Sequence, residues 1–357
     1  MQHRPHLFGE IMKIEPPLET TATLVYAALQ EKGRKEKPRS HLGASVIGHK
    51  CERWIWLSFR WAVREDFEGR ILRLFRRGQD EENYVYKDLD AAGLHVQPVD
   101  PNTGKQFNFA EGFFAGSMDG IIRSGVPEAP KAPHILEIKT HSVKSFDALV
   151  KDGVKKSKPQ HYDQMQTYMR YRLPINRALY FAVCKDDDRI YTERIDYDAK
   201  HAEKLREKAH RIIAMHRPPE KISEDATWFE CKYCAAHDLC HVGKITKHAN
   251  CRTCCHFTAT PEGKAMCSHW ESEIPTLDAQ IAGCECHLLH PDLTPWEAES
   301  TERGTLIFHT TEGPIENGEP DANIYASTEI LANWKACAKQ DEFMRGMREE
   351  MGARVTG

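Results

Sequence analysis

Residues 113–122, FFAGSMDGII, and residues 134–140, HILEIKT, are the part of the chain from which the fold follows. Both runs are rich in apolar and β-branched residues, so each is predicted to form one strand. Side chains two apart on a strand share a face, so Glu137 and Lys139 point together out of an otherwise apolar strand. Asp119, on the neighbouring strand, can come alongside them.

Two carboxylates with an adjacent ammonium have the chemistry of a site for a hard cation. Mg²⁺ or Mn²⁺ takes oxygen ligands and keeps several waters, and the backbone carbonyl of Ile138 offers a further oxygen beside Asp119 and Glu137. Lys139 could orient or deprotonate one of those waters for attack on phosphorus. The alternative is a half-buried strand that carries an ordinary salt bridge.

A helix follows at residues 160–171, QHYDQMQTYMRY. Met165 and Met169 are four residues apart, and so are Gln164 and Tyr168, which places the members of each pair one above the other. An Asp, a Glu-x-Lys strand and a helix with Gln-x-x-x-Tyr form one combined pattern, which is more specific than any of its pieces.

This pattern resembles the PD-(D/E)XK nuclease superfamily, in its RecB-like branch, over roughly residues 40–245. The proline that names the motif is absent. The resemblance implies a restriction-endonuclease-like fold of the α/β (α+β) class, with a mixed central sheet flanked by helices. It also implies that Asp119 and Glu137 bind metal, that Lys139 assists the water, and that Gln164 and Tyr168 orient the site and the DNA.

In this family a further metal ligand is usual on an upstream helix, and residues 75–86 are the matching stretch. Relatives carry a His or a Glu shortly after the glycine, and Gln79 stands where one subgroup has His. Glu82, four residues after Gly78, matches the Glu-bearing subgroup. Glu81 is the competing residue, and a solvated acidic helix face is the alternative to both.

Twelve cysteines and the lack of an N-terminal apolar run predict a protein of a reducing cytoplasm whose clustered cysteines bind metal. The first cluster has the spacing C-x2-C-x5-C and needs one more ligand, which lies far upstream. This arrangement resembles the [4Fe–4S] site of AddB-type helicase-nucleases and of CRISPR-associated RecB-like exonucleases, and zinc at the same ligands is the alternative. The ligands it implies are Cys51, Cys231, Cys234 and Cys240.

A second cluster of cysteines and histidines follows at residues 251–287 and has the signature of a zinc site. The four preferred ligands are Cys251, Cys254, Cys267 and Cys284. His287, Cys286 and His256 are the substitutes. Cys184 and Cys337 are predicted to lie in the core or to be incidental.

Length fits one sizeable domain and a small module. Together with the resemblance and the cysteine pattern it implies four segments: an N-terminal extension (1–40), the nuclease domain (41–245), a small zinc-binding module (246–300) and a C-terminal hairpin and helix (301–357). Periodicity predicts strands at 179–184 and 190–195 and helices at 199–216 and 327–351. No apolar stretch is long enough to span a membrane.

A net charge of −4 does not suit a protein that coats DNA in bulk. We therefore expect local runs of basic residues to bind the phosphates. A solvated charged face is the alternative reading of each run. The residues predicted to contact DNA are Arg76, Arg77, Lys144, Lys155, Lys156 and Lys158.

The sequence therefore predicts a Mg²⁺- or Mn²⁺-dependent DNA nuclease, an exonuclease that prepares DNA ends for recombination or repair. Residues 141–146 and 158–162 resemble stand-alone nucleases encoded by bacteriophages, which implies action in a bacterial host cytoplasm. Without a helicase P-loop, unwinding would come from a partner, and a recombinase or a single-strand-binding protein is the other implied partner. The alternatives are a DNA-binding adaptor with a vestigial nuclease site and an iron–sulfur oxidoreductase.

Overall fold

The computed structural model describes residues 20–339 and 342–356. These residues form two compact units, one of residues 20–37 and 66–77 and the other of residues 38–65 and 78–356. The predicted N-terminal extension lies outside the described residues up to residue 19. Within the described ranges, every helix is too short or too polar to cross a membrane.

The first unit consists of helix α1 (Thr21–Lys35) and the start of helix α3 (Gly69–Ala91). Thr20 caps the start of α1, because its side chain accepts a hydrogen bond from the backbone N–H of Thr23. In return, the Thr23 side chain accepts a hydrogen bond from the backbone N–H of Thr20. Arg34 pairs with Asp66 at 2.6 Å, which ties the end of α1 to the segment before α3.

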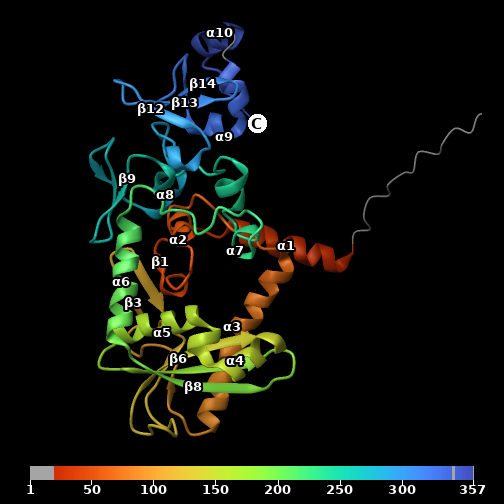
Figure 1. Ribbon diagram of the computed structural model, residues 1–357, viewed down its shortest axis with the longest axis vertical. Coiled ribbons are helices and arrows are strands. Elements are labelled where there is room, and N and C mark those ends of the chain that lie inside the picture. Colours follow the sequence, from red (N-terminus) through yellow and green to blue (C-terminus); the bar gives the residue numbers. More distant parts are fainter. Residues whose placement is uncertain (1–19, 340–341, 357) are drawn as a thin grey trace, which may run out of the picture. The chain divides into compact units, whose positions relative to one another are not determined.

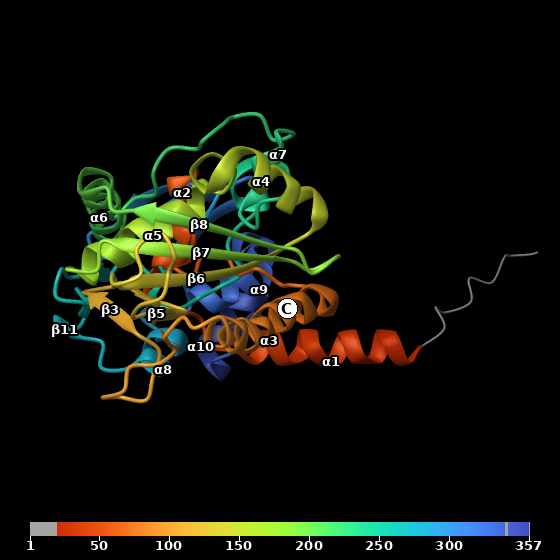
Figure 2. The same cartoon turned by 90° about the horizontal axis from the view of Figure 1, so that it is seen from below.

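A five-stranded mixed sheet is the centre of the second unit, and its order is β2-β5-β6-β7-β8. Strands β6 and β7 are parallel, whereas the other pairs are antiparallel. Figure 2 shows β6, β7 and β8 running side by side. The strands are β2 (Val96–Gln97), β5 (Gly120–Ile122), β6 (His134–His141), β7 (Arg177–Cys184) and β8 (Ile190–Asp196).

Helices pack on both faces of this sheet (Figure 1). Leu136 and Ile138 point to one face and pack with Val85 and Leu89 of α3. Ile135, one residue away in β6, points to the other face, where helices α4 (Val143–Ser157) and α5 (Pro159–Tyr171) lie. The predicted α/β class with a mixed sheet flanked by helices is therefore confirmed at this level.

The prediction of one strand over residues 113–122 is wrong. The run forms two short strands, β4 (Phe114–Ser117) and β5, which belong to different sheets. β4 pairs with β1 (Leu42–Gly43) and β3 (Asn108–Glu111), and the Met118 N–H then bonds to the Phe107 carbonyl at 2.8 Å. Because the chain changes sheets at this point, Asp119 lies in the gap between the strands.

The predicted strands at 179–184 and 190–195 and the helix at 199–216 correspond to β7, β8 and α6 (Ala199–Ala214). Of the helix predicted over 327–351, the described residues are helical as α9 (Ser327–Lys339) and α10 (Glu342–Met351), and residues 340–341 lie outside the described part of the chain. α9 is itself kinked at Asn333, whose side chain accepts a hydrogen bond from the Ala336 N–H and so caps a new turn.

The remaining elements surround the cysteine-rich part and the C-terminal part of the second unit. β9, β10 and β11 form a small antiparallel sheet, and β12 to β15 form a four-stranded sheet that α9 contacts. Their bounds, with those of the other short helices, are α2 (Glu52–Phe59), α7 (Phe229–Lys232), β9 (Phe257–Ala259), β10 (Ala265–Cys267), β11 (Ser272–Glu273), α8 (Leu277–Ala282), β12 (Glu297–Ser300), β13 (Leu306–Thr310), β14 (Gly313–Asn317) and β15 (Ile324–Tyr325).

The cysteine-rich segment shares the main apolar core. Phe257, Ala259 and Ala265 belong to the same buried cluster as Trp56 and Phe114. The boundaries predicted at residues 40, 245 and 300 stay predictions.

A buried arginine fastens this segment to the segment around α2. The guanidinium of Arg252 donates to the backbone carbonyls of Ser40 at 2.6 Å and Phe59 at 3.0 Å. It also lies 4.0 Å from the ring centroid of Trp61, and its side chain is fully buried. Burial lowers the pKa of Arg252 to about 9, so the group is still charged at neutral pH. A desolvated cation is tolerated here because oxygens and aromatic faces surround it.

Arg252→Leu is expected to lower the free energy of unfolding by about 3 kcal/mol, because the buried Phe59 carbonyl and the part-buried Ser40 carbonyl both lose a charged donor. Urea denaturation measures the change. Arg303→Leu, at an exposed position, is the matched control and should change the free energy of unfolding by less than about 0.5 kcal/mol. Equal stability of the two variants would mean that the Arg252 contacts contribute nothing net.

Candidate active site

Asp119, Glu137 and Lys139 lie together at the edge between β5 and β6. The Asp119 carboxylate accepts a hydrogen bond from the Ile138 N–H at 2.7 Å, and its Oδ2 lies 4.0 Å from Lys139 Nζ. Lys139 Nζ donates to Glu137 Oε1 and to the Ile138 carbonyl oxygen, the latter at 3.2 Å. The alternation of β6 thus places both charged side chains as the sequence predicts.

Glu137 is the most deeply buried carboxylate of the group. Its side chain is 0 % exposed, and among the residues that the structure describes its Oε2 has no hydrogen-bond partner. Burial raises the pKa of Glu137 to about 8, and the charge of Asp119 acts in the same direction. Burial alone would lower the pKa of Lys139, but the three nearby carboxylates raise it. An unpaired buried carboxylate oxygen is unfavourable unless a cation joins it.

Glu82 reaches the same group from α3. Burial, and then the charge of Asp119, raise the pKa of Glu82 to about 7, while Lys139 opposes the shift. Tyr86, one turn further along α3, donates from its hydroxyl to the Asp119 carbonyl at 2.7 Å and lies 3.5 Å from Glu82 Oε2. Of the two competing glutamates, Glu82 is thus the one that interacts with Asp119.

Gln164 and Tyr168 form a buried pair on α5. The Gln164 amide donates to the Tyr168 hydroxyl at 2.9 Å, and that hydroxyl donates to the Ser117 carbonyl at 2.6 Å. Ser117 ends β4, two residues before Asp119. The pair therefore fixes the end of β4, and through it the position of Asp119.

Three further polar residues beside the site are not among the predicted site residues: Tyr180 and His141 are buried, and His161 is half-buried. Tyr180 is the register partner of Glu137 on the parallel strand β7. Its hydroxyl is 2.8 Å from His141 Nε2 and 2.8 Å from His161 Nδ1. The one signal in the sequence is that His161 precedes Gln164 by three residues and therefore shares its helix face.

The predicted DNA-contacting residues have different surroundings. Arg76 and Arg77 are exposed on α3 and belong to the first unit. Lys144 and Lys155 are exposed on α4, and Lys156 pairs with Asp152 at 2.7 Å. Lys158, between α4 and α5, is half-buried and donates to Ser145 Oγ at 2.8 Å, so that it serves the interior as well as the surface.

The four cysteines predicted for the first cluster line one pocket, although Cys51 is far from the others in sequence. Cys51 caps the start of α2, where its sulfur accepts from the Trp54 N–H at 3.4 Å, and the Cys234 sulfur accepts from the Ala236 N–H at 3.4 Å. Cys231 lies in α7, and Cys240 lies in the π-helical turn Asp238–Val242. The described cysteines form no disulfide.

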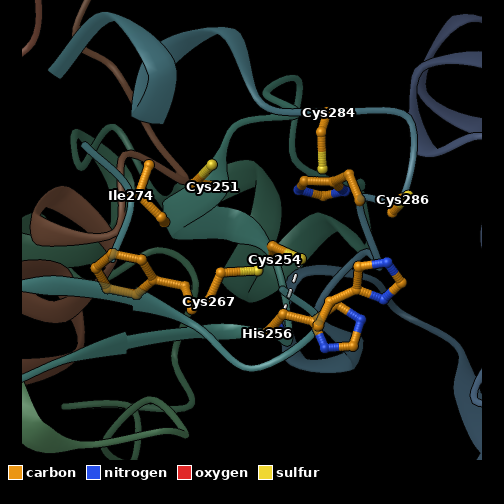
Figure 3. Close-up of a pocket in the computed structure, with 10 residues that line it drawn as sticks. Cys251, Cys254, His256, Cys267, Ile274, Cys284 and Cys286 are labelled. Atoms are coloured by element: carbon orange, nitrogen blue, oxygen red, sulfur yellow. Dashed lines mark hydrogen bonds between the residues drawn. The ribbon is translucent and has the colours of Figure 1, made fainter. Parts of the chain in front are cut away.

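The second group of cysteines lines another pocket, shown in Figure 3. All four preferred residues contribute to it, and so do Cys286, His256 and His269. His269 is not among the predicted ligands, although it lies only two residues after Cys267. His287 also lines the pocket, but its Nδ1 is 2.7 Å from Ser327 Oγ and its Nε2 is 3.0 Å from the Asn250 carbonyl. Both ring nitrogens of His287 are therefore already engaged.

As they stand, no three His, Cys, Asp or Glu side chains within the described ranges are placed so that they could hold a metal ion together. At the carboxylate site the ammonium of Lys139 bridges Glu137 Oε1 and the Ile138 carbonyl oxygen. In the thiol pockets, burial raises the pKa of Cys234 to about 11 and that of Cys254 to about 12. The chemistry of the donors nevertheless fits the expected metals. The carboxylate site offers hard oxygens, one of them buried without a hydrogen-bond partner, which suits Mg²⁺ or Mn²⁺. Each thiol pocket offers at least four cysteines, which suits an iron–sulfur cluster or zinc.

No family model matches the chain, and no curated protein matches it. Similar solved structures include SSO0001, at 15% sequence identity and a TM-score of 0.38, with 62% of this chain and 96% of that chain covered. They also include the alkaline exonuclease LHK-Exo from Laribacter hongkongensis, at 18% identity and a TM-score of 0.37, over 54% of this chain and 90% of that one. The same exonuclease in complex with dAMP gives a TM-score of 0.36.

Proposed function

We propose that this protein is a metal-dependent deoxyribonuclease. The observation that carries the proposal is the buried Glu137 oxygen without a partner, set beside Asp119, Glu82 and Lys139. The contact with Lys139 satisfies Glu137 Oε1 only, and among the described residues nothing pairs with the buried Oε2. Three mutually repelling carboxylates around one half-buried ammonium have the composition of a site that takes up a divalent cation.

In this mechanism Asp119, Glu137 and the Ile138 carbonyl hold one or two Mg²⁺ or Mn²⁺ ions, with Glu82 as the further ligand. When bound, the cation supplies charge neutralisation for the phosphate oxygens and lowers the pKa of water. The oxygen of water attacks phosphorus and gives up one proton to solvent, the bond from phosphorus to the leaving oxygen breaks, and that oxygen takes a proton from solvent. Because nearby carboxylates raise the pKa of Lys139, it acts as a donor that orients the water, not as the base. Gln164 and Tyr168 keep Asp119 in place through Ser117.

The proposed substrate and setting follow the sequence prediction: an exonuclease that prepares DNA ends for recombination or repair, encoded by a bacteriophage and acting in the host cytoplasm. Its partners are DNA and a recombinase, a single-strand-binding protein or a helicase. Exposed Lys144, Lys155 and Lys156 on α4 contact phosphates, and Arg76 and Arg77 on α3 do the same. Such contacts supply affinity that falls with salt and does not depend on base sequence.

Purified protein incubated with labelled blunt, tailed and circular DNA, with Mn²⁺ or with EDTA, tests the proposal. Cleavage that requires the metal ion and spares circles supports an exonuclease. Binding without cleavage on every substrate would instead identify a DNA-binding adaptor with a vestigial site. Neither binding nor cleavage, with a redox-active chromophore, would favour an iron–sulfur oxidoreductase.

The two thiol pockets are proposed to bind structural metals. The pocket of Cys51, Cys231, Cys234 and Cys240 would hold a [4Fe–4S] cluster. Two of these cysteine sulfurs, those of Cys51 and Cys234, already accept a hydrogen bond from a backbone N–H. The other pocket holds one zinc ion through Cys251, Cys254, Cys267 and Cys284, since a closed set of thiolates leaves no position for a substrate. Because this segment shares the main core, metal analysis belongs on the full chain, where Cys254→Ser should remove zinc and leave iron.

The metal-free protein should lose stability as pH rises through about 7 to 8. The pKa values of Glu82 and Glu137 are raised in the folded state, so their contribution is complete below the unfolded pKa and is lost as these groups ionise. Thermal unfolding of wild type and of Glu137→Gln, in EDTA at pH 6 to 9, measures the effect. The wild-type Tm should fall relative to that of the variant, and Mn²⁺ should restore it most at high pH. Parallel curves in EDTA would contradict the assigned pKa shift.

A further inference from the structure

A row of hydrogen bonds runs from the surface to the candidate active site. Lys158 Nζ is 2.8 Å from Ser145 Oγ, and Ser145 Oγ is 3.3 Å from His141 Nδ1. His141 Nε2 and His161 Nδ1 each lie 2.8 Å from the Tyr180 hydroxyl. The row joins α4, β6, β7 and α5, and ends at His161.

The interior members of this row are uncharged at neutral pH. Tyr180 is fully buried, which raises its pKa far above the usual value. Burial lowers the pKa of His161 to about 3, with Lys139 as the next cause, and lowers that of His141 to about 4, with Lys158 as the next cause. Each imidazole therefore carries one proton, and the tautomer decides which nitrogen donates.

The lysine at the start sets the direction of the row, because an ammonium can only donate. Ser145 accepts from Lys158 and has one hydroxyl proton, for which His141 Nδ1 is the acceptor that the described structure offers. His141 then carries its proton on Nε2 and donates to Tyr180, and Tyr180 donates to His161 Nδ1. The proton of His161 is left on Nε2.

This Nε2–H is at the site. Tyr180 is beside Glu137 in the sheet register, and the charge of Lys139 acts on His161. His161, Gln164 and Tyr168 are spaced three and four residues apart on α5 and so share one face. Among the described residues no group accepts a hydrogen bond from His161 Nε2, and this nitrogen is not one of the fully buried unpaired atoms.

We propose that His161 is a further DNA-contacting residue, whose Nε2–H donates a hydrogen bond to a non-bridging oxygen of a phosphodiester. Tyr180, His141, Ser145 and Lys158 are positioning residues that fix its tautomer. A neutral donor suits this place because a second cation beside Lys139 would compete with the metal ions for the carboxylates. The inference rests on the proposed nuclease function, but the tautomer can be measured without any cleavage.

The tautomers are tested by long-range ¹H–¹⁵N correlation spectra of the full chain labelled on histidine. The expected result is that His141 and His161 are both protonated on Nε2. In Tyr180→Phe, which keeps the buried ring and removes the hydroxyl, His161 should change to a mixture of tautomers. A wild-type His161 that is protonated on Nδ1, or that is unchanged in Tyr180→Phe, would overturn the proposed row.

The contact with DNA is tested by affinity for a defined oligonucleotide in the Glu137→Gln background, which keeps the DNA uncut. His161→Phe should weaken binding by about tenfold, because a hydrogen bond to a charged group is lost. His161→Gln, which retains a donor, should recover part of the loss. The contacted phosphate is located with a series of oligonucleotides, each of which carries one neutral methylphosphonate at a different position. At one position, the protein with native His161 and the His161→Phe variant should bind with equal affinity.

Failure of the inference and failure of the proposed function give different results. If the wild-type protein cuts DNA, and the His161→Phe variant cuts and binds DNA as well as the wild type, the inference is wrong and the proposed function stands. A tenfold loss that is the same at every methylphosphonate position would show a structural role only, and would also refute it. If no DNA is cut under any metal condition, the proposed function fails, while the binding comparison still decides whether His161 contacts phosphate.

Discussion

Glu137→Gln is expected to reduce Mg²⁺- or Mn²⁺-dependent DNA cleavage by about a thousandfold or more. The amide keeps the shape of the carboxylate but has no charge with which to hold a cation, and the affected oxygen is the one that lacks a partner. Lys139→Met should have a similar effect, since it removes the donor that orients the water. Initial rates of end-labelled duplex degradation measure both variants.

The fold should survive these substitutions. Glu137→Gln relieves the burial of a group whose pKa is raised to about 8, so far-ultraviolet circular dichroism and Tm at neutral pH should stay the same or improve. DNA binding should persist or tighten as negative charge is removed. Glu297→Gln, on the exposed strand β12, is the matched control and should cut at the wild-type rate. Cleavage by Glu137→Gln within tenfold of wild type, at limiting Mg²⁺, would remove the assignment of the site.

The second large effect is expected for Cys51→Ser. Protein purified without oxygen should be brown and contain about four irons per chain, and the variant should be colourless and poorly soluble. Cys51 begins α2, whereas the other three cysteines of its pocket follow α6, so the cluster closes a very long loop. Such a closure restricts the unfolded chain, and its loss should lower stability by about 4 kcal/mol, by analogy with a covalent cross-link.

Iron analysis, visible absorption and soluble yield check this prediction. Cys184→Ala is the control: Cys184 is buried in β7 and lines neither thiol pocket, so the colour should remain. A colourless wild type with two zinc ions per chain and no iron, even from preparation without oxygen, would contradict the cluster. It would leave a zinc clip at the same four thiols.

The sequence by itself predicts the features that depend on short-range periodicity. Glu137 and Lys139 share a face because successive side chains of a strand alternate. Gln164 and Tyr168 meet because a helix brings residues four apart together. The strands β7 and β8 and the helix α6 follow from the same local rules, whereas the mixed sheet is what the family resemblance implies.

Tertiary structure alone decides what depends on distant packing. The switch between two sheets places Asp119 beside Ile138, although residues 113–122 read as one strand. Glu82 and Glu81 are adjacent in α3, and the difference between them is that Glu82 interacts with Asp119. This interaction depends on how α3 packs against the sheet.

The same holds for the buried polar contacts. Tyr180 lies in an apolar strand, and nothing local marks its hydroxyl as the link between His141 and His161. Nothing in the sequence near Arg252 marks it as a buried donor to the carbonyls of Ser40 and Phe59. Because a buried polar group needs partners that arrive from elsewhere in the chain, its role is decided only when the chain has folded.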